Sequence, residues 1–393
     1  MGVFEQNISL RQMAAAQLDL VNAQLAYAAS RCSFYAGWYQ GPLRDIRELS
    51  RLPFTTAQDI LEQGRDMICV SAAQVQRVVS LRSSGTSGPW KRLYFTADDL
   101  EQTVAFFAQG MKYLCSPGQR VLICLPGVAE DGVGQLLSQG LTRLGAQPLP
   151  YGPISDYQDA ASCLRQNRPH TIVGIPAQLR RLALTAPDCP PVNVLLSADR
   201  IPPVLRRTLE RVWGCQVFEH YGLTESGLGG AVECPAHQGL HIRHDALHLD
   251  IVEPGGRRSL PPGQWGEIVL TTLTRRAMPL LRYRTGDMGR LLAPACGCGS
   301  LLPRLDTVRG RLSELSRELS VYWLDDVLLA EDGVLDYSAA WQGKTLSLTV
   351  AGDREAARLR LQAACPQLSL EIREGEGFVT TGTLKRSILT PCC

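Results

Sequence analysis

The sequence predicts an α/β protein, in which a large N-terminal domain has parallel sheets covered by helices plus a small antiparallel sheet. A small α+β C-terminal domain follows. Helical stretches alternate with short apolar runs from about residue 97, short strands with Gly and Pro turns begin after Glu233, and 393 residues exceed one simple core. Such alternation is typical of parallel sheet covered on both faces, and long chains divide into domains.

The first elements are predicted from composition and capping residues. Residues 8–30 are rich in Ala, Leu and Gln and lack Gly and Pro, which predicts a helix. Thr55 or Thr56 is expected to cap a second helix that begins near Ala57, and residues 75–81 are expected to form a short strand. The strands of the parallel sheet are then expected at residues 120–126, 146–150, 170–174, 192–196 and 216–218.

The remaining strands are predicted to be antiparallel or to belong to the C-terminal domain. Residues 248–254, 266–273 and 282–287 are short runs between turns, as in antiparallel sheet. Residues 311–393 show a helix, a strand, a second helix and a second strand. We therefore expect domains at residues 1–309 and 310–393, with a hinge near Gly310 and Arg311.

Charge and cysteine usage exclude several classes of function. The 40 Lys and Arg residues nearly balance the 38 Asp and Glu residues, and no long run has one sign, so nothing supports nucleic-acid or membrane-surface binding. The apolar stretches are far shorter than the roughly 20 residues that span a bilayer. Thirteen irregularly spaced cysteines without an export signal indicate reduced thiols and a cytoplasmic protein.

A loop of small residues follows the strand at residues 75–81. Its hydroxyls, glycines and backbone N–H groups can approach a polyphosphate closely, although a flexible loop has a similar composition. It is not a Walker loop, because the Gly-Lys-Ser/Thr ending is absent. The residues of this candidate phosphate loop are Ser83, Ser84, Gly85, Thr86, Ser87, Gly88 and Lys91.

Two further segments combine an aromatic ring, a hydroxyl and a carboxylate. In FEHYGLTE, residues 218–225, Tyr221 offers a ring, Thr224 a hydroxyl and Glu225 a metal ligand. In LRYRTGD, residues 281–287, Asp287 can accept hydrogen bonds from ribose hydroxyls. Each residue taken singly is common in structural turns.

In this order, the three segments resemble the adenylate-forming superfamily of acyl-CoA synthetases. LPFTTAQDI, EHYGLTESG, LRYRTGD and the CGCG segment before LLPRL resemble its phenylacetate–coenzyme A ligase-like branch. The resemblance implies an AMP-forming acid–CoA ligase. Such an enzyme uses ATP to convert a carboxylic acid, here an aryl acid such as phenylacetate by analogy, to an acyl-adenylate. It then transfers the acyl group to coenzyme A and releases AMP and pyrophosphate.

The resemblance also implies roles for individual residues. Tyr221 would stack on adenine, Thr224 would bond the α-phosphate, Glu225 would hold Mg²⁺, and Asp287 with Arg311 would hold the ribose. Ser84, Thr86, Ser87 and Gly88 would surround the β- and γ-phosphates. The remaining residues expected at the ATP and AMP site are Ser83, Gly85, Lys91, Ser197, Ala198, Asp199, His220, Gly222 and Arg304.

The chain departs from the family near its C-terminus. The adenylation lysine usually follows a glycine directly, whereas Thr383 follows Gly382 here, so Lys385 is the best available catalytic lysine. In the family the C-terminal domain is mobile and rotates about the hinge, and the departures here leave two alternatives open. One is an adenylating enzyme with an acceptor other than coenzyme A, and the other is a degenerate nucleotide-binding protein without ligase activity.

Cys234, His241, Cys296 and Cys298 form a candidate metal site. Four Cys and His ligands in two clusters suit tetrahedral zinc, although Cys-x-Cys is tighter than the usual spacing. Related ligases carry similar positions with a structural zinc, which the resemblance implies here as well. Reduced thiols are the alternative, and other histidines are alternative ligands, namely His237, His244 and His248.

The expected partners are a small-molecule carboxylic acid, ATP and coenzyme A, with no nucleic acid and no membrane. We expect the acid pocket between residues 125–134, the turn at residues 151–153, the Ser197 loop and Tyr221. The first of these loops contains no aromatic residue, and its Glu130 and Asp131 could face a polar or cationic acid. A homodimer is the oligomeric state that we consider, and no sequence feature indicates an oligomeric state.

Overall fold

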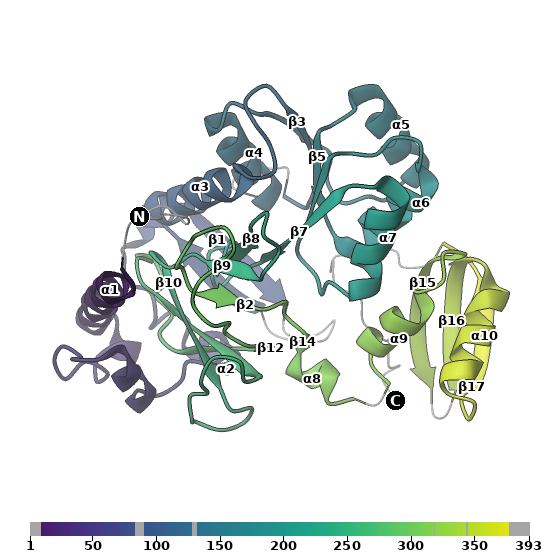
Figure 1. Ribbon diagram of the computed structural model, residues 1–393. Helices are drawn as coiled ribbons and strands as arrows, with labels where there is room; N and C mark the ends of the chain where they lie inside the picture. Colours follow the sequence, from purple (N-terminus) through teal and green to yellow (C-terminus); the bar gives the residue numbers. More distant parts are fainter. Residues whose placement is uncertain (1–8, 83–89, 128–131, 318, 343–344, 377–393) are drawn as a thin grey trace.

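A mixed sheet of eight strands forms the centre of the computed structural model, which describes residues 9–82, 90–127, 132–317, 319–342 and 345–376 (Figure 1). Five strands are parallel, in the order β7-β6-β5-β3-β4, and three short strands, β8, β9 and β13, extend the sheet in antiparallel fashion. The strands are β3 (Arg120–Cys124), β4 (Gln147–Pro150), β5 (Thr171–Gly174), β6 (Asn193–Leu196), β7 (Gln216–Tyr221), β8 (Ala231–Glu233), β9 (Leu240–Ile242) and β13 (Arg304–Leu305).

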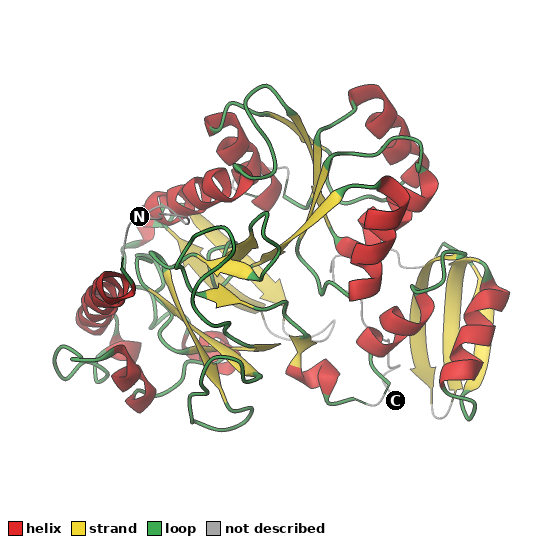
Figure 2. Cartoon of the chain, in the orientation of Figure 1, coloured by secondary structure: helices red, strands yellow, loops and turns green. Residues whose placement is uncertain are grey.

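Helices cover both faces of the parallel strands (Figure 2). Alternate residues of β3 enter different cores, because successive side chains of a strand point to opposite faces. Val121 and Ile123 join the core that contains α3 and α4, whereas Leu122 and Cys124 join the core that contains α5, α6 and α7. The helices are α3 (Ala97–Met111), α4 (Val133–Arg143), α5 (Tyr157–Asn167), α6 (Pro176–Thr185) and α7 (Pro203–Trp213).

A separate antiparallel sheet has the order β10-β11-β12-β14. Its strands confirm the antiparallel pairing that the sequence predicts after Glu233. They are β10 (Leu247–Val252), β11 (Gly266–Thr272), β12 (Tyr283–Gly289) and β14 (Gly310–Arg311), and the short helix α8 (Leu312–Leu315) follows β14.

The N-terminal segment packs against these sheets and confirms the predicted first helix. The segment contains α1 (Leu10–Arg31), α2 (Ala57–Gln63) and the hairpin of β1 (Arg77–Arg82) and β2 (Trp90–Phe95). Thr56, not Thr55, caps α2, and its hydroxyl accepts a hydrogen bond of 3.2 Å from the Asp59 N–H. Thr55 is fully buried and donates to the carbonyl oxygen of Leu281 at 2.7 Å.

The C-terminal segment folds into a compact α+β unit beside α6 and α7 (Figure 1). The unit consists of α9 (Val321–Leu328), β15 (Val334–Gln342), β16 (Thr345–Gly352), α10 (Arg354–Ala364) and β17 (Ser369–Glu374). The sequence predicts four of these elements but not β15. The register of β15 shifts between Val334 and Asp336, and this irregularity interrupts the alternation that identifies a strand.

No helix within the described ranges is long and apolar enough to cross a membrane.

Candidate active site

A cleft of about 600 Å³ opens where the parallel sheet meets β12, β14 and α9. The loops after β6 and β7 form two of its walls, as expected for a ligand site at the carboxyl ends of parallel strands. Seven of the residues predicted to bind the nucleotide line this cleft together, and they are Ala198, Asp199, His220, Tyr221, Gly222, Asp287 and Arg311.

Asp287 connects two of the predicted motifs at the floor of the cleft. The Tyr221 hydroxyl donates to Asp287 Oδ2 at 3.0 Å, and Arg311 Nε lies 2.9 Å from Asp287 Oδ1. Pairing of Asp287 with Arg311 between β12 and β14 fixes this geometry. Burial and the Asp287 charge raise the pKa of Tyr221, so the phenol stays neutral and acts as a donor.

Two backbone features shape the loops after β6 and β7. Ala198 has a φ of 72°, a left-handed conformation that is strained for a residue other than glycine and that occurs often at functional sites. Gly222 lies so close to the next turn that a Cβ would approach the Leu228 carbonyl oxygen to 2.5 Å. Only glycine therefore fits between Tyr221 and Leu223 without displacing the backbone.

Glu225 lies in a small buried polar cluster. It forms an ion pair with Lys91 and accepts a hydrogen bond of 2.9 Å from the Tyr283 hydroxyl. Lys91 also donates to the Tyr283 hydroxyl at 3.2 Å. Burial alone would raise the pKa of Glu225. The Lys91 ammonium and the hydrogen bonds of the carboxylate outweigh burial, so the pKa lies below its ordinary value and the carboxylate is ionised. An ionised carboxylate is a suitable ligand for Mg²⁺.

An apolar pocket of about 400 Å³ adjoins the cleft, and His220 lines both. Its lining includes Leu125, Val133 and Ser197 of the loops where the sequence predicts the acid pocket. Two aromatic residues of α3, which the prediction does not include, line it as well, and they are Phe106 and Phe107. No motif marks these phenylalanines, whose sequence pattern is that of an ordinary core helix. The turn at residues 151–153 contributes no lining residue, and Glu130 and Asp131 lie outside the described residues.

The polar groups of this pocket are Ser197 and His220. Ser197 Oγ lies 2.9 Å from His220 Nδ1, and the opposite ring nitrogen, Nε2, is buried without a hydrogen-bond partner among the described residues. Burial lowers the pKa of His220 to about 4, so the imidazole is neutral near pH 7. The pocket thus offers an apolar wall and a neutral polar end next to the cleft.

The structure does not bring every predicted residue to the cleft. Thr224 is half-buried in the turn between Gly222 and Glu225. Arg304 lies elsewhere and donates to carbonyl oxygens of the loops at Gln238, Ala293 and Ala295. The predicted phosphate loop at residues 83–88 and the predicted lysine, Lys385, lie outside the described residues.

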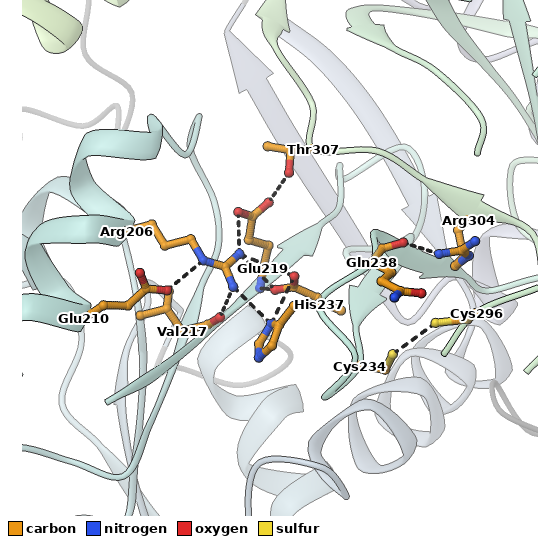
Figure 3. A network of polar contacts seen from close by, with 11 residues as sticks. Arg206, Glu210, Val217, Glu219, Cys234, His237, Gln238, Cys296, Arg304 and Thr307 are labelled. Atoms are coloured by element: carbon orange, nitrogen blue, oxygen red, sulfur yellow. Dashed lines mark hydrogen bonds and ion pairs between the residues drawn. The ribbon is translucent and has the colours of Figure 1, made fainter. Parts of the chain in front are cut away.

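The four predicted metal ligands come together from three segments. The ligand atoms of Cys234, His241, Cys296 and Cys298 all lie within 4.8 Å of one another. Cys234 Sγ is 3.6 Å from Cys296 Sγ, and Cys298 Sγ is 3.4 Å from His241 Nε2 (Figure 3 shows Cys234 facing Cys296). Three thiols and one imidazole at these separations fit a tetrahedral zinc ion.

The alternative histidines have other partners. His237 Nδ1 lies 3.0 Å from Arg206, and His244 and His248 both bond the amide of Gln17.

A polar network around Arg206 joins Glu233, the neighbour of Cys234 in the chain, to the cleft residues Glu219 and Thr307 (Figure 3). Arg206 on α7 pairs with Glu219 at 3.1 Å and with Glu233 at 3.3 Å. The Thr307 hydroxyl, at the cleft wall, donates to Glu219 at 2.8 Å. Burial raises the pKa of Glu233 to about 7. The network therefore connects α7, β7 and β8 with the segment between β13 and β14, which contains Thr307.

Comparisons with known proteins agree on one family. Residues 78–273 match the model of the AMP-binding enzyme family. The chain is 28% identical to the phenylacetate–coenzyme A ligase of Escherichia coli (strain K12), with 79% of this chain and 74% of that protein aligned. It is 29% identical to the protein of the same name from Thermus thermophilus, with 83% of this chain and 77% of that protein aligned.

A solved structure extends the likeness to nearly the whole chain. The crystal structure of a 2-hydroxyisobutyryl-CoA ligase in the postadenylation state superposes with a TM-score of 0.81 and 18% identity. The superposition covers 98% of this chain and 91% of that chain. At this level of identity, the superposition shows that the fold is the same, including the C-terminal unit.

Proposed function

Because the chain belongs to the adenylate-forming superfamily of AMP-binding enzymes, in its phenylacetate–coenzyme A ligase-like branch, we propose that it is an AMP-forming acid–CoA ligase. It would activate a carboxylic acid with ATP and transfer the acyl group to coenzyme A. One observation carries the proposal: the polar cleft and the apolar pocket share His220. An acid in the pocket would therefore present its carboxylate next to the cleft.

The first half-reaction requires alignment and charge neutralisation rather than a general base. The substrate carboxylate is the nucleophile, attacks the α-phosphorus in line, and displaces pyrophosphate. We assign Tyr221 to the adenine, Asp287 and Arg311 to the ribose, and Thr224 to the α-phosphate. Glu225 would hold Mg²⁺, which when bound neutralises charge on the phosphates. The ionised carboxylate of Glu225 supports this role.

Lys91 would serve the phosphates. In the structure its ammonium pairs with Glu225. Binding of Mg²⁺ at Glu225 would compete with this pair and would free the ammonium for the phosphate oxygens, so we assign Lys91 to the triphosphate. Lys385 stays our candidate for the adenylation lysine.

The pocket favours an acid with an uncharged tail. Phe106, Phe107 and Met111 supply apolar surface, and His220 is neutral. Aromatic rings pack well against such walls, and a charged tail would lose its hydration without gaining a partner. We therefore propose an aryl acid, with phenylacetate first because the curated relatives carry that name.

We further propose that Cys234, His241, Cys296 and Cys298 hold a structural zinc ion. Four protein ligands would close the coordination sphere and leave no position for a substrate.

A cytoplasmic location and a homodimer also stay predictions. Eleven cysteines of the described residues are free, which supports a reducing compartment.

Pyrophosphate release tests the proposed function directly. The purified chain would be incubated with ATP and Mg²⁺ and with aryl, aliphatic and amino acids in turn, with and without coenzyme A. We expect release with aryl acids and a faster steady state with coenzyme A. Equal product formation without the thiol would indicate another acceptor. An absence of release with every acid would contradict the ligase.

A further inference from the structure

A buried arginine attaches the C-terminal unit to the N-terminal part of the chain. Arg180 on α6 is fully buried. Its guanidinium donates to the carbonyl oxygens of Val334 at 2.9 Å and Glu331 at 2.8 Å, both in the C-terminal unit. These hydrogen bonds from a charged donor to two carbonyl oxygens join α6 to the C-terminal unit in its docked position.

Apolar and ionic contacts extend this interface along α7. Leu205 of α7 belongs to the same hydrophobic cluster as Leu324, Val334 and other residues of the C-terminal unit. Near the cleft, Arg200 Nη2 lies 2.9 Å from Asp326 Oδ2. Farther along, Arg211 pairs with Asp332 at 2.6 Å, and both of those side chains are exposed. The interface is therefore apolar at its centre and ionic at its edges.

The docked unit places one of its side chains in the cleft. Tyr322 on α9 lines the cleft together with Tyr221 and Asp287. The Arg311 N–H donates to the Tyr322 hydroxyl at 3.0 Å. The Tyr322 ring covers Gly310, whose φ is 122°, and a Cβ at Gly310 would overlap the ring. The Tyr322 ring, which belongs to the unit after the predicted hinge, therefore packs directly against the hinge residue Gly310.

Arg200 connects this ring to the interface. Its guanidinium carbon lies 4.9 Å from the centroid of the Tyr322 ring, and it donates to the Tyr322 carbonyl oxygen at 3.3 Å. The same guanidinium holds Asp326 on the next turn of α9. Arg200 itself lines the cleft next to Ala198 and Asp199, whereas Asp326 does not line it. Loss of the Asp326 carboxylate would therefore loosen the position of Tyr322 without removing any cleft atom.

We propose that Tyr322 is a nucleotide-positioning residue delivered by the C-terminal unit, and that the pairing of Arg200 with Asp326 holds it in the cleft. Its ring gives adenine or ribose an apolar surface, and its hydroxyl fixes the backbone of Arg311 beside Asp287. The inference rests on the proposed function, because it assumes that the cleft binds the nucleotide.

Calorimetric titration with AMP tests this role without any acid or coenzyme A. We expect Tyr322→Ala to weaken AMP binding about tenfold, the size typical of a lost base–aromatic contact. Tyr322→Phe keeps the ring and should bind more tightly than Tyr322→Ala. Asp326→Ala should weaken binding about threefold. Asp332→Ala is the matched control, because it removes an exposed carboxylate of the same unit away from Tyr322, and it should change the affinity less than about twofold.

A double-mutant cycle shows whether Asp326 acts through Tyr322. In the Tyr322→Ala background, Asp326→Ala should have no further effect on AMP binding, because the ring that it positions is gone. If the two effects multiply instead, Asp326 acts independently and the holding role is wrong. A thermal melt of each variant, with a melting temperature near that of the wild type, establishes that the measured AMP affinities belong to folded proteins.

The outcomes separate this inference from the proposed function. If the wild type binds AMP and Tyr322→Ala binds it equally well, the role of Tyr322 is refuted while the ligase stands. If the wild type neither binds AMP nor releases pyrophosphate with any acid, the proposed function fails and the inference falls with it. Weaker AMP binding by Tyr322→Ala and Asp326→Ala, with Asp332→Ala unchanged, supports the proposal.

Discussion

The Tyr221 hydroxyl donates a hydrogen bond of 3.0 Å to the Asp287 carboxylate, although 66 positions separate the two residues in the sequence. Asp287 also faces Arg311 at 2.9 Å, so one carboxylate orients a ring on β7 and a guanidinium on β14. The carboxylate is only slightly exposed, which strengthens both contacts. Two motifs that look like ordinary turns when taken singly therefore form one preorganised surface.

Removal of the Asp287 charge should weaken ATP binding more than it slows chemistry. Asp287→Asn keeps the shape of the side chain but loses the charge-assisted bonds to Arg311 and to the ribose. Such bonds contribute about 1.5–3 kcal/mol, which predicts a rise of about tenfold or more in the KM for ATP with little change in kcat. Steady-state pyrophosphate release over a range of ATP concentrations measures both constants.

Tyr221→Phe is the matched control for this change. It removes the hydroxyl that bonds Asp287 and keeps the ring for the adenine. The KM for ATP should rise less than in Asp287→Asn. Wild-type constants in Asp287→Asn would contradict the ribose assignment.

Substitution of Glu225 should largely abolish the Mg²⁺-dependent adenylation reaction. Glu225→Gln preserves a hydrogen-bond acceptor for Tyr283 and Lys91 but removes the negative charge that a divalent cation needs. We expect adenylation to fall by about 100-fold or more, as when a group that stabilises developing charge is removed. Pyrophosphate release is measured during a titration with Mg²⁺.

An exposed glutamate provides the comparison for that experiment. Glu253→Gln changes a surface carboxylate that pairs with Arg258, and its rate should equal that of the wild type. If Glu225→Gln responds to Mg²⁺ as the wild type does, another residue holds the metal.

The sequence predicted the residues whose chemistry is distinctive. Tyr221 and Asp287 are each common in structural turns, so the order of their motifs and the family resemblance, not either residue alone, predicted their roles. The ligands around Cys234 stand out as two clusters of Cys and His. By contrast, Phe106 and Phe107 have the sequence pattern of a core helix. Whether an apolar side chain fills a core or lines a pocket depends on the packing of α3 against other elements, which no local pattern records.

The same limit applies to the C-terminal unit. Tyr322 precedes Trp323 in an apolar run and carries no motif, so its place in the cleft depends on how α9 docks. In the sequence, Arg180 looks like a surface residue of an amphipathic helix. The carbonyl groups that it bonds in the buried interface belong to residues more than 150 positions later, so no local pattern shows that it is buried. Periodicity predicts which face of a helix is apolar, but it cannot identify a distant partner.

Loss of one cysteine should release the proposed zinc ion. The purified wild type should contain about one zinc ion per chain, and Cys298→Ser should contain much less, because three ligands hold the ion more weakly than four. The melting temperature should fall, since the proposed ion would join β8, β9 and the loop before β13. Metal analysis and thermal melts measure the two effects.

Cys365→Ser serves as the control for the zinc experiment, because Cys365 is a free thiol outside the cluster. Its zinc content should match that of the wild type. Equal zinc content in Cys298→Ser and the wild type would refute the site. A wild type without zinc would favour reduced thiols.

The buried imidazole of His220 should destabilise the protein in mild acid. Its pKa is about 4 in the folded chain against an ordinary value of 6.5, so the unfolded chain binds the proton more readily. The contribution of neutral His220 to the free energy of unfolding is fully present above pH 6.5 and is lost as the pH falls from there toward 4. From about pH 7.5 to about pH 5, His220 should account for a loss of about 1–2 kcal/mol.

Urea unfolding of the wild type and of His220→Asn measures this contribution. The asparagine keeps a polar partner for Ser197 but does not titrate, so its loss of stability over the same interval should be smaller by that amount. Every other titrating group contributes to both proteins and cancels in the difference. Identical losses in the two proteins would mean that His220 is accessible to protons in the folded state.

A methyl group added at Gly110 should narrow the acid pocket. Gly110 lies on α3 and lines the pocket, and a Cβ there would lie 3.3 Å from Val232 Cγ1, another lining atom. Gly110→Ala should therefore disfavour bulky acids, and Gly110→Val should do so more strongly. Because one methylene changes discrimination by about 1–3 kcal/mol, the ratio of kcat/KM between a small and a bulky acid should shift about tenfold or more in Gly110→Val.

The stability of Gly110→Ala separates a pocket effect from general damage. Alanine favours a helix interior over glycine by about 1 kcal/mol, so the melting temperature of this variant should be kept or raised while its acid preference changes. Gly37→Ala, where a Cβ would meet no atom within 4 Å, should leave the preference unchanged. A uniform fall in kcat/KM for all acids, without a change in their ratio, would mean that Gly110 does not border the bound acid.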